Sequence, residues 1–315
     1  MKKILLPLDG SPLADQAIPH AAALARAFNA EILCLRVVGG GEAEGSLEWR
    51  LERAEAASYL ADVAAVLSGA GCRASVELSV GRASEQILHC ARAAGADVIA
   101  LTSHGRGGMT DFSLSGTAFK VLSRAPCSIM VVPSKEGATV ARRPAIYESV
   151  LVGLGQTPRS DWAARLAATI ARTHDAELIL AHALPVAATI DGGDIPETSA
   201  QDLQRSTASA AKRHLKSLTG ELKDGSLRMA TVVLTGPDPA RAIRRAASAA
   251  GASLIVTAVG APQEGGRPSY GEVSNALLGG TDVPILVLHD STIEPRYRLA
   301  PQSNRWSRKA LPAAP

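Results

Sequence analysis

The chain repeats itself, and this repeat constrains its possible folds more than any other feature. Residues 4–38 align with residues 150–184 without a gap, and 11 of the 35 pairs are identical. Since a domain takes about 150 residues, the 315-residue chain is predicted to hold two copies of one unit. The predicted parts are a first domain at 1–133, a linker at 134–146, a second domain at 147–290 and a basic, flexible tail at 291–315.

Within each copy, short apolar runs alternate with longer helical patterns. In the first copy we expect strands at 3–8, 31–38, 73–80, 97–101 and 127–132, and helices at 12–28, 47–69, 84–94 and 116–123. Strands that alternate with helices indicate right-handed βαβ units and a parallel sheet. Runs that are apolar throughout fit strands covered on both faces. The predicted fold class is therefore α/β, with a parallel sheet in each copy.

Composition agrees with globular domains and excludes several classes of protein. Apolar residues make up 46% of the chain, and 33 basic residues balance 30 acidic ones to a net charge of +3, which is not typical of a nucleic-acid binder. No apolar run approaches the roughly 18 residues of a membrane span. The opening run Ile4–Leu6 breaks at Pro7, too early for a signal peptide. We expect a cytoplasmic protein with no membrane or nucleic-acid partner.

The sequence offers no pattern for a metal site or a catalytic nucleophile. Its four cysteines all lie in the first half and form no CxxC pair, so we expect reduced, structural thiols. The histidines show no metal-ligand spacing, and no GxSxG elbow is present. We therefore assign no catalytic residue and no metal ligand. The cysteines are Cys34, Cys72, Cys90 and Cys127.

Two loops that follow predicted strands have the composition of an anion site. The first is Asp9–Ser11, and the second is Thr102–Gly108, which continues to Ser115–Thr117 at a predicted helix start. Glycines let backbone N–H groups approach an oxyanion, and a helix start supplies further free N–H groups. Arg106 adds a planar cation, and Asp9 is able to accept from a ribose hydroxyl or an amine. If the first and fourth strands are neighbours, the two loops form one nucleotide phosphate cradle.

This pattern is neither of the two common phosphate motifs, and Asp9 has a second interpretation. No GxxxxGK[ST] loop occurs, and the glycines follow the fourth strand instead of opening the first. A carboxylate at a strand end also caps a following helix or stabilises a turn. The structural and the ligand-binding interpretations of Asp9 both stay open at this point.

The segments Lys3–Ser11, Thr102–Gly108, Leu114–Ala118 and Ala125–Val132 together resemble universal stress protein (UspA-type) domains. The resemblance covers both copies, so the chain looks like a tandem member of that family. It implies two Rossmann-like domains, each a five-stranded parallel sheet in the order 3-2-1-4-5 flanked by helices. That order places the first and fourth strands side by side.

One branch of the family binds ATP through a G-x2-G-x9-G-[S/T] loop, which implies ATP or a related adenine nucleotide as the ligand here. Two of the four motif positions differ in this chain: Thr102 stands at the first glycine, and Ser115-Gly116 replaces the final pair. A shift of one residue would let Gly116-Thr117 take its place. By the same resemblance Asp9 and Val37 lie at the adenosine end. The candidate binding residues are Asp9, Val37, Thr102, Gly105, Arg106, Gly108, Ser115, Gly116 and Thr117.

The second copy departs further from the motif and is expected to be a structural partner. Gly155 stands where Asp9 stands, and Pro262 removes a backbone donor from its loop. The fifth strands, 127–132 and 284–288, are apolar edge strands in the order above, and such edges invite pairing. In this family they associate across a pseudo-two-fold axis. We expect the two domains to pair in this way, and a homodimer of chains stays open.

Three functions compete at the level of sequence. The first is a non-enzymatic stress-response module that binds an adenine nucleotide in the first domain. The alternative is an interaction protein of the same fold that binds no nucleotide. The third is an ATP-cleaving enzyme of the related adenine-nucleotide hydrolase fold. Against it, no SGGxDS-type loop follows the first strand and no acid/base pair is evident, although a weak ATPase activity is not excluded.

Overall fold

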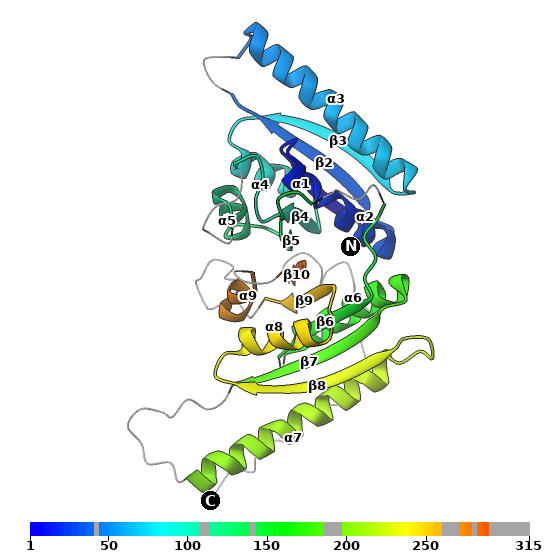
Figure 1. Ribbon diagram of the computed structural model, residues 1–315, viewed down its shortest axis with the longest axis vertical. Coiled ribbons are helices and arrows are strands. Elements are labelled where there is room, and N and C mark those ends of the chain that lie inside the picture. Colours follow the sequence, from blue (N-terminus) through cyan, green and yellow to red (C-terminus); the bar gives the residue numbers. More distant parts are fainter. Residues whose placement is uncertain are drawn as a thin grey trace, which may run out of the picture.

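The strands form one continuous sheet that runs through both halves of the chain (Figure 1). The computed structural model describes residues 1–40, 44–107, 114–138, 143–155, 157–185, 197–259, 271–278 and 282–289. The strand order is β3-β2-β1-β4-β5-β10-β9-β6-β7-β8, which confirms the predicted order 3-2-1-4-5 in each half. The strands are β1 (Lys3–Leu8), β2 (Glu31–Val38), β3 (Arg73–Val80), β4 (Val98–Thr102), β5 (Ser128–Val132), β6 (Ser149–Leu154), β7 (Glu177–Pro185), β8 (Met229–Gly236), β9 (Leu254–Ala258) and β10 (Ile285–Leu288).

Helices cover both faces of this sheet, as an α/β fold with buried parallel strands requires. Buried side chains of α2, α3, α6 and α7 pack on one face, and those of α4, α5, α8 and α9 pack on the other. The long helices α3 and α7 lie over the outer strands at opposite ends of the molecule (Figure 1). The helices are α1 (Pro12–Asp15), α2 (Ile18–Phe28), α3 (Leu47–Gly69), α4 (Ala83–Ala93), α5 (Gly116–Leu122), α6 (Pro158–His174), α7 (Glu197–Leu222), α8 (Pro239–Ala249) and α9 (Gly271–Leu278).

The expected single helix at 12–28 is two helices in the structure. Helix α1 ends at Asp15, and the backbone N–H of Gln16 turns back to the carbonyl oxygens of Leu13 and Ala14. Helix α2 then starts at Ile18 with Pro19 in its first turn, where the missing N–H of proline has no cost. The apolar pattern is continuous across the break, so it does not reveal the break in sequence.

The repeat seen in the sequence recurs in local structure. Ser11 and Thr157 occupy equivalent positions, and each accepts a hydrogen bond from a backbone N–H of the helix that it caps. Asn29 and Asp175 end the equivalent helices α2 and α6 in the left-handed conformation, with φ of 49° and 52°. Matched caps at both ends explain why the two copies keep their helices in register with their strands.

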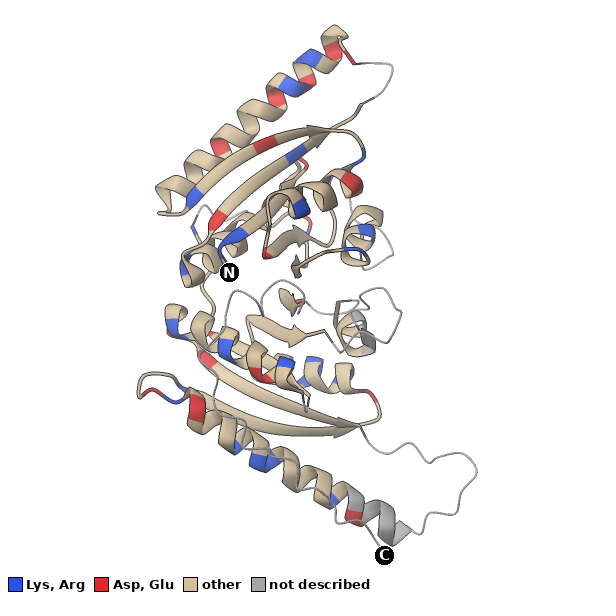
Figure 2. Ribbon diagram, turned by 180° about the vertical axis from the view of Figure 1, so that it is seen from behind, with Lys and Arg blue, Asp and Glu red and all other residues tan. Residues whose placement is uncertain are grey.

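Strands β5 and β10 join the two halves as an antiparallel pair. Met130 lies opposite Leu286, and Ile129 lies opposite Val287, all of them buried. The hydroxyl of Ser128 accepts a hydrogen bond from the backbone N–H of His289 at 3.1 Å. Both strands lack charged residues, as their uniform tan colour in Figure 2 shows. The expected pairing of the fifth strands within one chain is confirmed, and β3 and β8 are the outer edges of the sheet.

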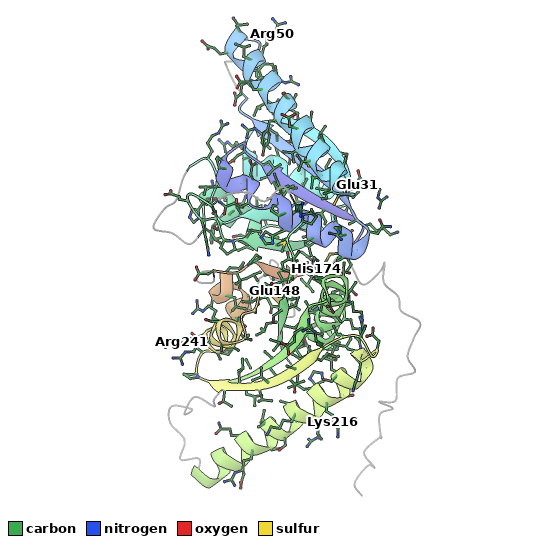
Figure 3. All side chains as sticks on the ribbon, turned by 45° about the vertical axis from the view of Figure 1, so that its right-hand side comes forward. Glu31, Arg50, Glu148, His174, Lys216 and Arg241 are labelled. Carbon is green, nitrogen blue, oxygen red and sulfur yellow. The ribbon has the colours of Figure 1, made fainter. Side chains whose placement is uncertain are left out.

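A polar contact between α2 and the segment that leads into β6 also links the two halves. The Nδ1 atom of His20 lies 3.1 Å from the hydroxyl of Tyr147, which is fully buried. The Tyr147 ring meets the His174 ring edge-on with 4.9 Å between centroids, and Figure 3 shows His174 where the halves meet. Burial lowers the pKa of His20 to about 4. His20 is therefore neutral at physiological pH.

Because the halves share one sheet, we expect the chain to unfold in a single transition. Ile129→Ala removes a fully buried side chain from β5 and is expected to cost about 2–5 kcal/mol. Chemical denaturation should show one transition that shifts as a whole. The control Val76→Ala changes a residue of β3 that is 49% exposed, and should stay within about 0.5 kcal/mol of the parent chain. Two separate transitions, with only one shifted by Ile129→Ala, would contradict the shared sheet.

Neutral His20 also predicts a loss of stability in acid. The unfolded chain binds the proton near the ordinary pKa of 6.5, whereas the folded chain binds it only near 4. Stability from this group is therefore full above the higher value and falls as pH drops toward the lower one. Between about pH 7.5 and pH 5, the parent chain should lose about 2 kcal/mol more than His20→Gln. The control is His89→Gln at an exposed position, which should retain the full pH dependence. If all three proteins lose the same unfolding free energy between these pH values, His20 is not the cause of the acid sensitivity.

Candidate functional site

A cavity of about 430 Å³ lies in the first half, at the carboxyl ends of β1, β2 and β4. This volume falls within the range of small-molecule pockets. Gly108 lies outside the described residues. The other eight candidate residues all line the cavity: Asp9, Val37, Thr102, Gly105, Arg106, Ser115, Gly116 and Thr117.

The carboxylate of Asp9 joins the two loops that the sequence singled out. Its Oδ1 atom accepts from the backbone N–H of Ser11 at 2.9 Å and from the Ser11 hydroxyl at 2.6 Å. Its Oδ2 atom accepts from the backbone N–H of Arg106 at 2.5 Å. The Ser11 contacts are the turn-stabilising role that the sequence left open. A carboxylate accepts about four hydrogen bonds, so Asp9 retains room for one donor of a ligand.

Gly105 is required at its position by the same carboxylate. A Cβ atom at residue 105 would lie 2.2 Å from Oδ2 of Asp9, far inside contact distance. Only glycine lets the loop after β4 approach the loop after β1 this closely. A Cβ at Gly107, two residues on, would meet no atom of the described residues within 4 Å. The close contact with Asp9 therefore calls for glycine at residue 105 and not at residue 107.

The altered motif position Ser115 is accommodated by a capping role. Its hydroxyl accepts from the backbone N–H of Ala118 at 3.2 Å, and its own N–H donates to the carbonyl of Ser103 at 2.7 Å. Its φ of −63° suits any residue, so no glycine is needed there. Gly116 and Thr117 are exposed at the cavity wall. They are the exposed members of this segment that line the cavity.

The loop after β4 is held by hydroxyl groups from a distant segment. The hydroxyls of Ser103 and Ser134 lie 2.8 Å apart, and Ser134 also accepts from the backbone N–H of His104 at 2.9 Å. The hydroxyl of Thr102 donates to the carbonyl of His104 at 2.6 Å, so it is already used inside the loop. Thr102 therefore contributes shape to the cavity. Ser134 was missed in sequence because its partners lie about 30 residues away.

Helices α4 and α5 add residues to the cavity that the motif did not indicate. Ala83 and Ile87 of α4 form part of an apolar wall, and Lys120 of α5 adds a second cation besides Arg106. Residues three apart lie on one face of a helix. Because Thr117 faces the cavity from α5, Lys120 could have been expected there from the sequence. The cavity therefore combines an apolar wall with two cationic side chains.

The remaining polar groups of the described part give no support for metal or thiol chemistry. No cluster of three or more His, Cys, Asp and Glu side chains in that part is arranged to hold a metal ion. All four cysteines are free and buried. Burial raises the pKa of the Cys34 and Cys127 thiols to about 12, so neither is an effective nucleophile. None of the described helices combines the length and the apolar character needed to cross a bilayer.

The second half lacks the feature that joins the loops in the first. Gly155 occupies the position of Asp9, so no carboxylate is available there to accept from a neighbouring loop. Residues 260–270, which include Pro262, lie outside the described part of the chain. The candidate site is therefore assigned to the first half.

Comparisons with known proteins point to one family in both halves. The model of the universal stress protein family matches residues 1–133 and 146–289. A universal stress protein of Methanocaldococcus jannaschii is 32% identical over 144 residues, which cover 43% of this chain and 85% of that protein. One of Thermus aquaticus is 34% identical over 138 residues, covering 42% and 98%. A universal stress protein structure from Archaeoglobus fulgidus has a TM-score of 0.62 at 18% identity, covers 91% of this chain and 98% of that chain, and supports the fold.

The contact between residue 105 and Asp9 yields a direct test of the loop arrangement. Gly105→Ala should displace the Asp9 carboxylate, break its bond from Arg106 and cost about 1–3 kcal/mol of unfolding free energy. The matched control Gly107→Ala should be close to neutral, because its Cβ meets no atom of the part of the chain that the structure describes. Both are measured by chemical denaturation. Equal effects of the two substitutions would show that the two loops do not meet as described.

Proposed function

The chain belongs to the universal stress protein family, and we propose that its first half binds an adenine nucleotide, ATP or a related one, in the cavity beside Asp9. The main support is the Asp9 carboxylate, which fastens the loop after β1 to the glycine loop after β4 and keeps one acceptor position free. The cavity lies at the carboxyl ends of the strands, where open α/β sheets bind nucleotides. Figure 1 shows α4 and α5 on the side of the sheet that borders the cavity.

The cavity lining suits the two chemical parts of such a ligand. Leu35, Val37 and Ile87 offer apolar surface to a planar base. Arg106 and Lys120 offer positive charge to phosphate groups, and the glycine at 107 leaves its backbone accessible. In this proposal Asp9 accepts from a ribose hydroxyl, and Thr117 donates its hydroxyl to a phosphate oxygen.

We propose a regulatory and not a catalytic role for this binding, in a cytoplasmic stress-response protein. Asp9 already accepts three hydrogen bonds, which makes it a poor general base. His104 is buried, and its Nδ1 atom lies 3.1 Å from the Ser103 hydroxyl inside the loop network. The lining residues therefore favour holding a ligand over transforming it. Occupancy of the cavity would instead influence contacts with partners.

The alternative is an interaction module of the same fold without a nucleotide. One observation favours it. Thr102 and Ser115 stand at two motif positions, and the hydroxyl of each forms a hydrogen bond with the protein backbone. Gently purified protein separates the two proposals by mass spectrometry. A co-purified adenine nucleotide supports the binding proposal. Absence of nucleotide, together with no heat in titration with ATP, supports the interaction module.

Calorimetric titration of the full chain with ATP tests the role of Thr117. Thr117→Val removes one hydroxyl donor from the cavity wall and should weaken binding by about 1–2 kcal/mol, roughly tenfold in Kd. The control Thr173→Val removes a hydroxyl that bonds to Thr169 within α6, away from the cavity, and should leave Kd unchanged. Unchanged affinity in Thr117→Val would remove Thr117 from the ligand contacts.

A further inference from the structure

Arg36 is a buried cation without a hydrogen-bond partner among the described residues. It lies on β2, is 5% exposed, and its Nε and Nη1 atoms are buried and unpaired there. Moving a charge out of water costs several kcal/mol unless other groups compensate for it. The surroundings of Arg36 must therefore supply that compensation through charge.

The guanidinium of Arg36 lies against the turn that carries Asp9. Strands β1 and β2 pair with Leu8 opposite Arg36, which brings the side chain to the end of β1. A Cβ at Gly10 would lie 2.9 Å from Nη1, so the guanidinium occupies the space of a side chain at that position. The φ of Gly10 is +72°, a second reason for glycine there. Arg36 therefore packs directly behind the loop that presents Asp9.

Charges on four elements face Arg36, since its guanidinium also acts to lower the pKa of the Asp15 carboxyl on α1. Burial lowers the pKa of its guanidinium and the charge of Arg106 lowers it further, whereas Asp9, Tyr59 and Glu52 oppose this, with Asp9 contributing most. Asp9 is thus its main compensating charge, although the two side chains share no hydrogen bond. Arg36 is not among the described residues that line the cavity, and its guanidinium lies beside Gly10, next to Asp9.

The second half provides an internal comparison for this arrangement. Strands β6 and β7 pair with Leu154 opposite His182, so His182 occupies the position of Arg36. The half with a carboxylate after β1 carries a guanidinium on the next strand. The half with Gly155 in that place carries an imidazole.

A neighbouring contact is kept in both halves and does not explain the exchange. The Tyr59 hydroxyl donates to Asp15 in the first half, and His214 lies 2.8 Å from Asp161 in the second. Asp15 and Asp161 are equivalent in the repeat. Asp15 and its equivalent Asp161 are thus present in both halves. The change from Arg36 to His182 therefore goes together with the change from Asp9 to glycine.

We propose that Arg36 is a positioning residue of the candidate site, which holds the charged Asp9 carboxylate and its turn in the ligand-binding arrangement. Its effect on a nucleotide rests on the proposed function, since Asp9 is the group that contacts the ligand. The effect runs through charge across Gly10 and needs no hydrogen bond. A cation at residue 36 is therefore required only while residue 9 is a carboxylate.

A double-mutant cycle on the full chain tests this proposal. Calorimetric titration with ATP is compared for the parent chain, Arg36→Met, Asp9→Asn and the double variant. Arg36→Met alone should weaken binding roughly tenfold, and should change it by less than about twofold when Asp9→Asn is already present. Arg36→Lys, which keeps the charge, should restore most of the affinity. The matched control His182→Met, at the equivalent position of the second half, should leave affinity unchanged.

The outcomes separate this proposal from the proposed function. Equal losses from Arg36→Met in both backgrounds, or no loss at all, would overturn it, because a general structural role does not depend on residue 9. If the parent chain binds no adenine nucleotide, the proposed function fails. The free energy of unfolding is then measured for the same four proteins. Non-additive losses for Asp9→Asn and Arg36→Met then support the positioning of Asp9, and additive losses overturn it. Should Arg36→Met not fold, Arg36→His takes its place.

Discussion

Two carboxylates fasten β1 to its surroundings, one at each end, and the candidate site depends on this clamp. At the amino end, buried Asp97 accepts from the backbone N–H groups of Lys2 and Lys3 at 2.6 and 3.0 Å. At the carboxyl end, Asp9 accepts from the backbone of Arg106 across 97 residues of sequence. Because β1 and β4 are parallel neighbours, this brings both polar loops to one rim of the sheet. Among the described residues of the second half, a contact equivalent to the first of these clamps is present. There the hydroxyl of Ser253 accepts from the backbones of Glu148 and Ser149, while glycine stands in place of Asp9.

This difference separates what the fold needs from what the site needs. A clamp at the amino end holds the sheet together and is present in both halves, as a carboxylate or as a hydroxyl. A clamp at the carboxyl end adds a charge and fixes a loop, and within the described residues it is seen in the first half. The Arg36 guanidinium beside this partly buried carboxylate is itself buried, and a buried charge is costly unless it is compensated, so the pairing of Arg36 with Asp9 indicates a use beyond stability. The two halves thus share an architecture, and within the described residues the first half holds the polar groups of the candidate site.

The sequence predicted those features that follow from periodicity and from the repeat. Strand order and the pairing of β5 with β10 followed because apolar edge strands must be covered, and the family resemblance supplied the order. The two loops met as expected because the strand order brings β1 and β4 together. The Ser134 contacts and the surroundings of Arg36 were not predictable, because their partners lie far away in sequence and their spacing follows no period. The contact between His182 and His214, with ring centroids 6.1 Å apart, could not be predicted either, because the two residues also lie far apart in sequence.

The network around Ser134 bears on how the candidate site is prepared for a ligand. The backbone N–H of Ser103 donates to the carbonyl of Val132 at the end of β5, and Ser134 holds the next loop residue. Lys135 and Gln16 exchange two hydrogen bonds, which fix the segment after β5 to the residue that ends α1. The loops on both sides of the cavity are therefore anchored to one short segment that leaves the central strand pair. Hydrogen bonds already hold residues 103 and 104 of this loop, so a ligand that binds there avoids most of the entropy cost of ordering them. A short motif with two altered positions can for this reason retain a usable geometry, since the scaffold and not the glycine pattern alone fixes the loop.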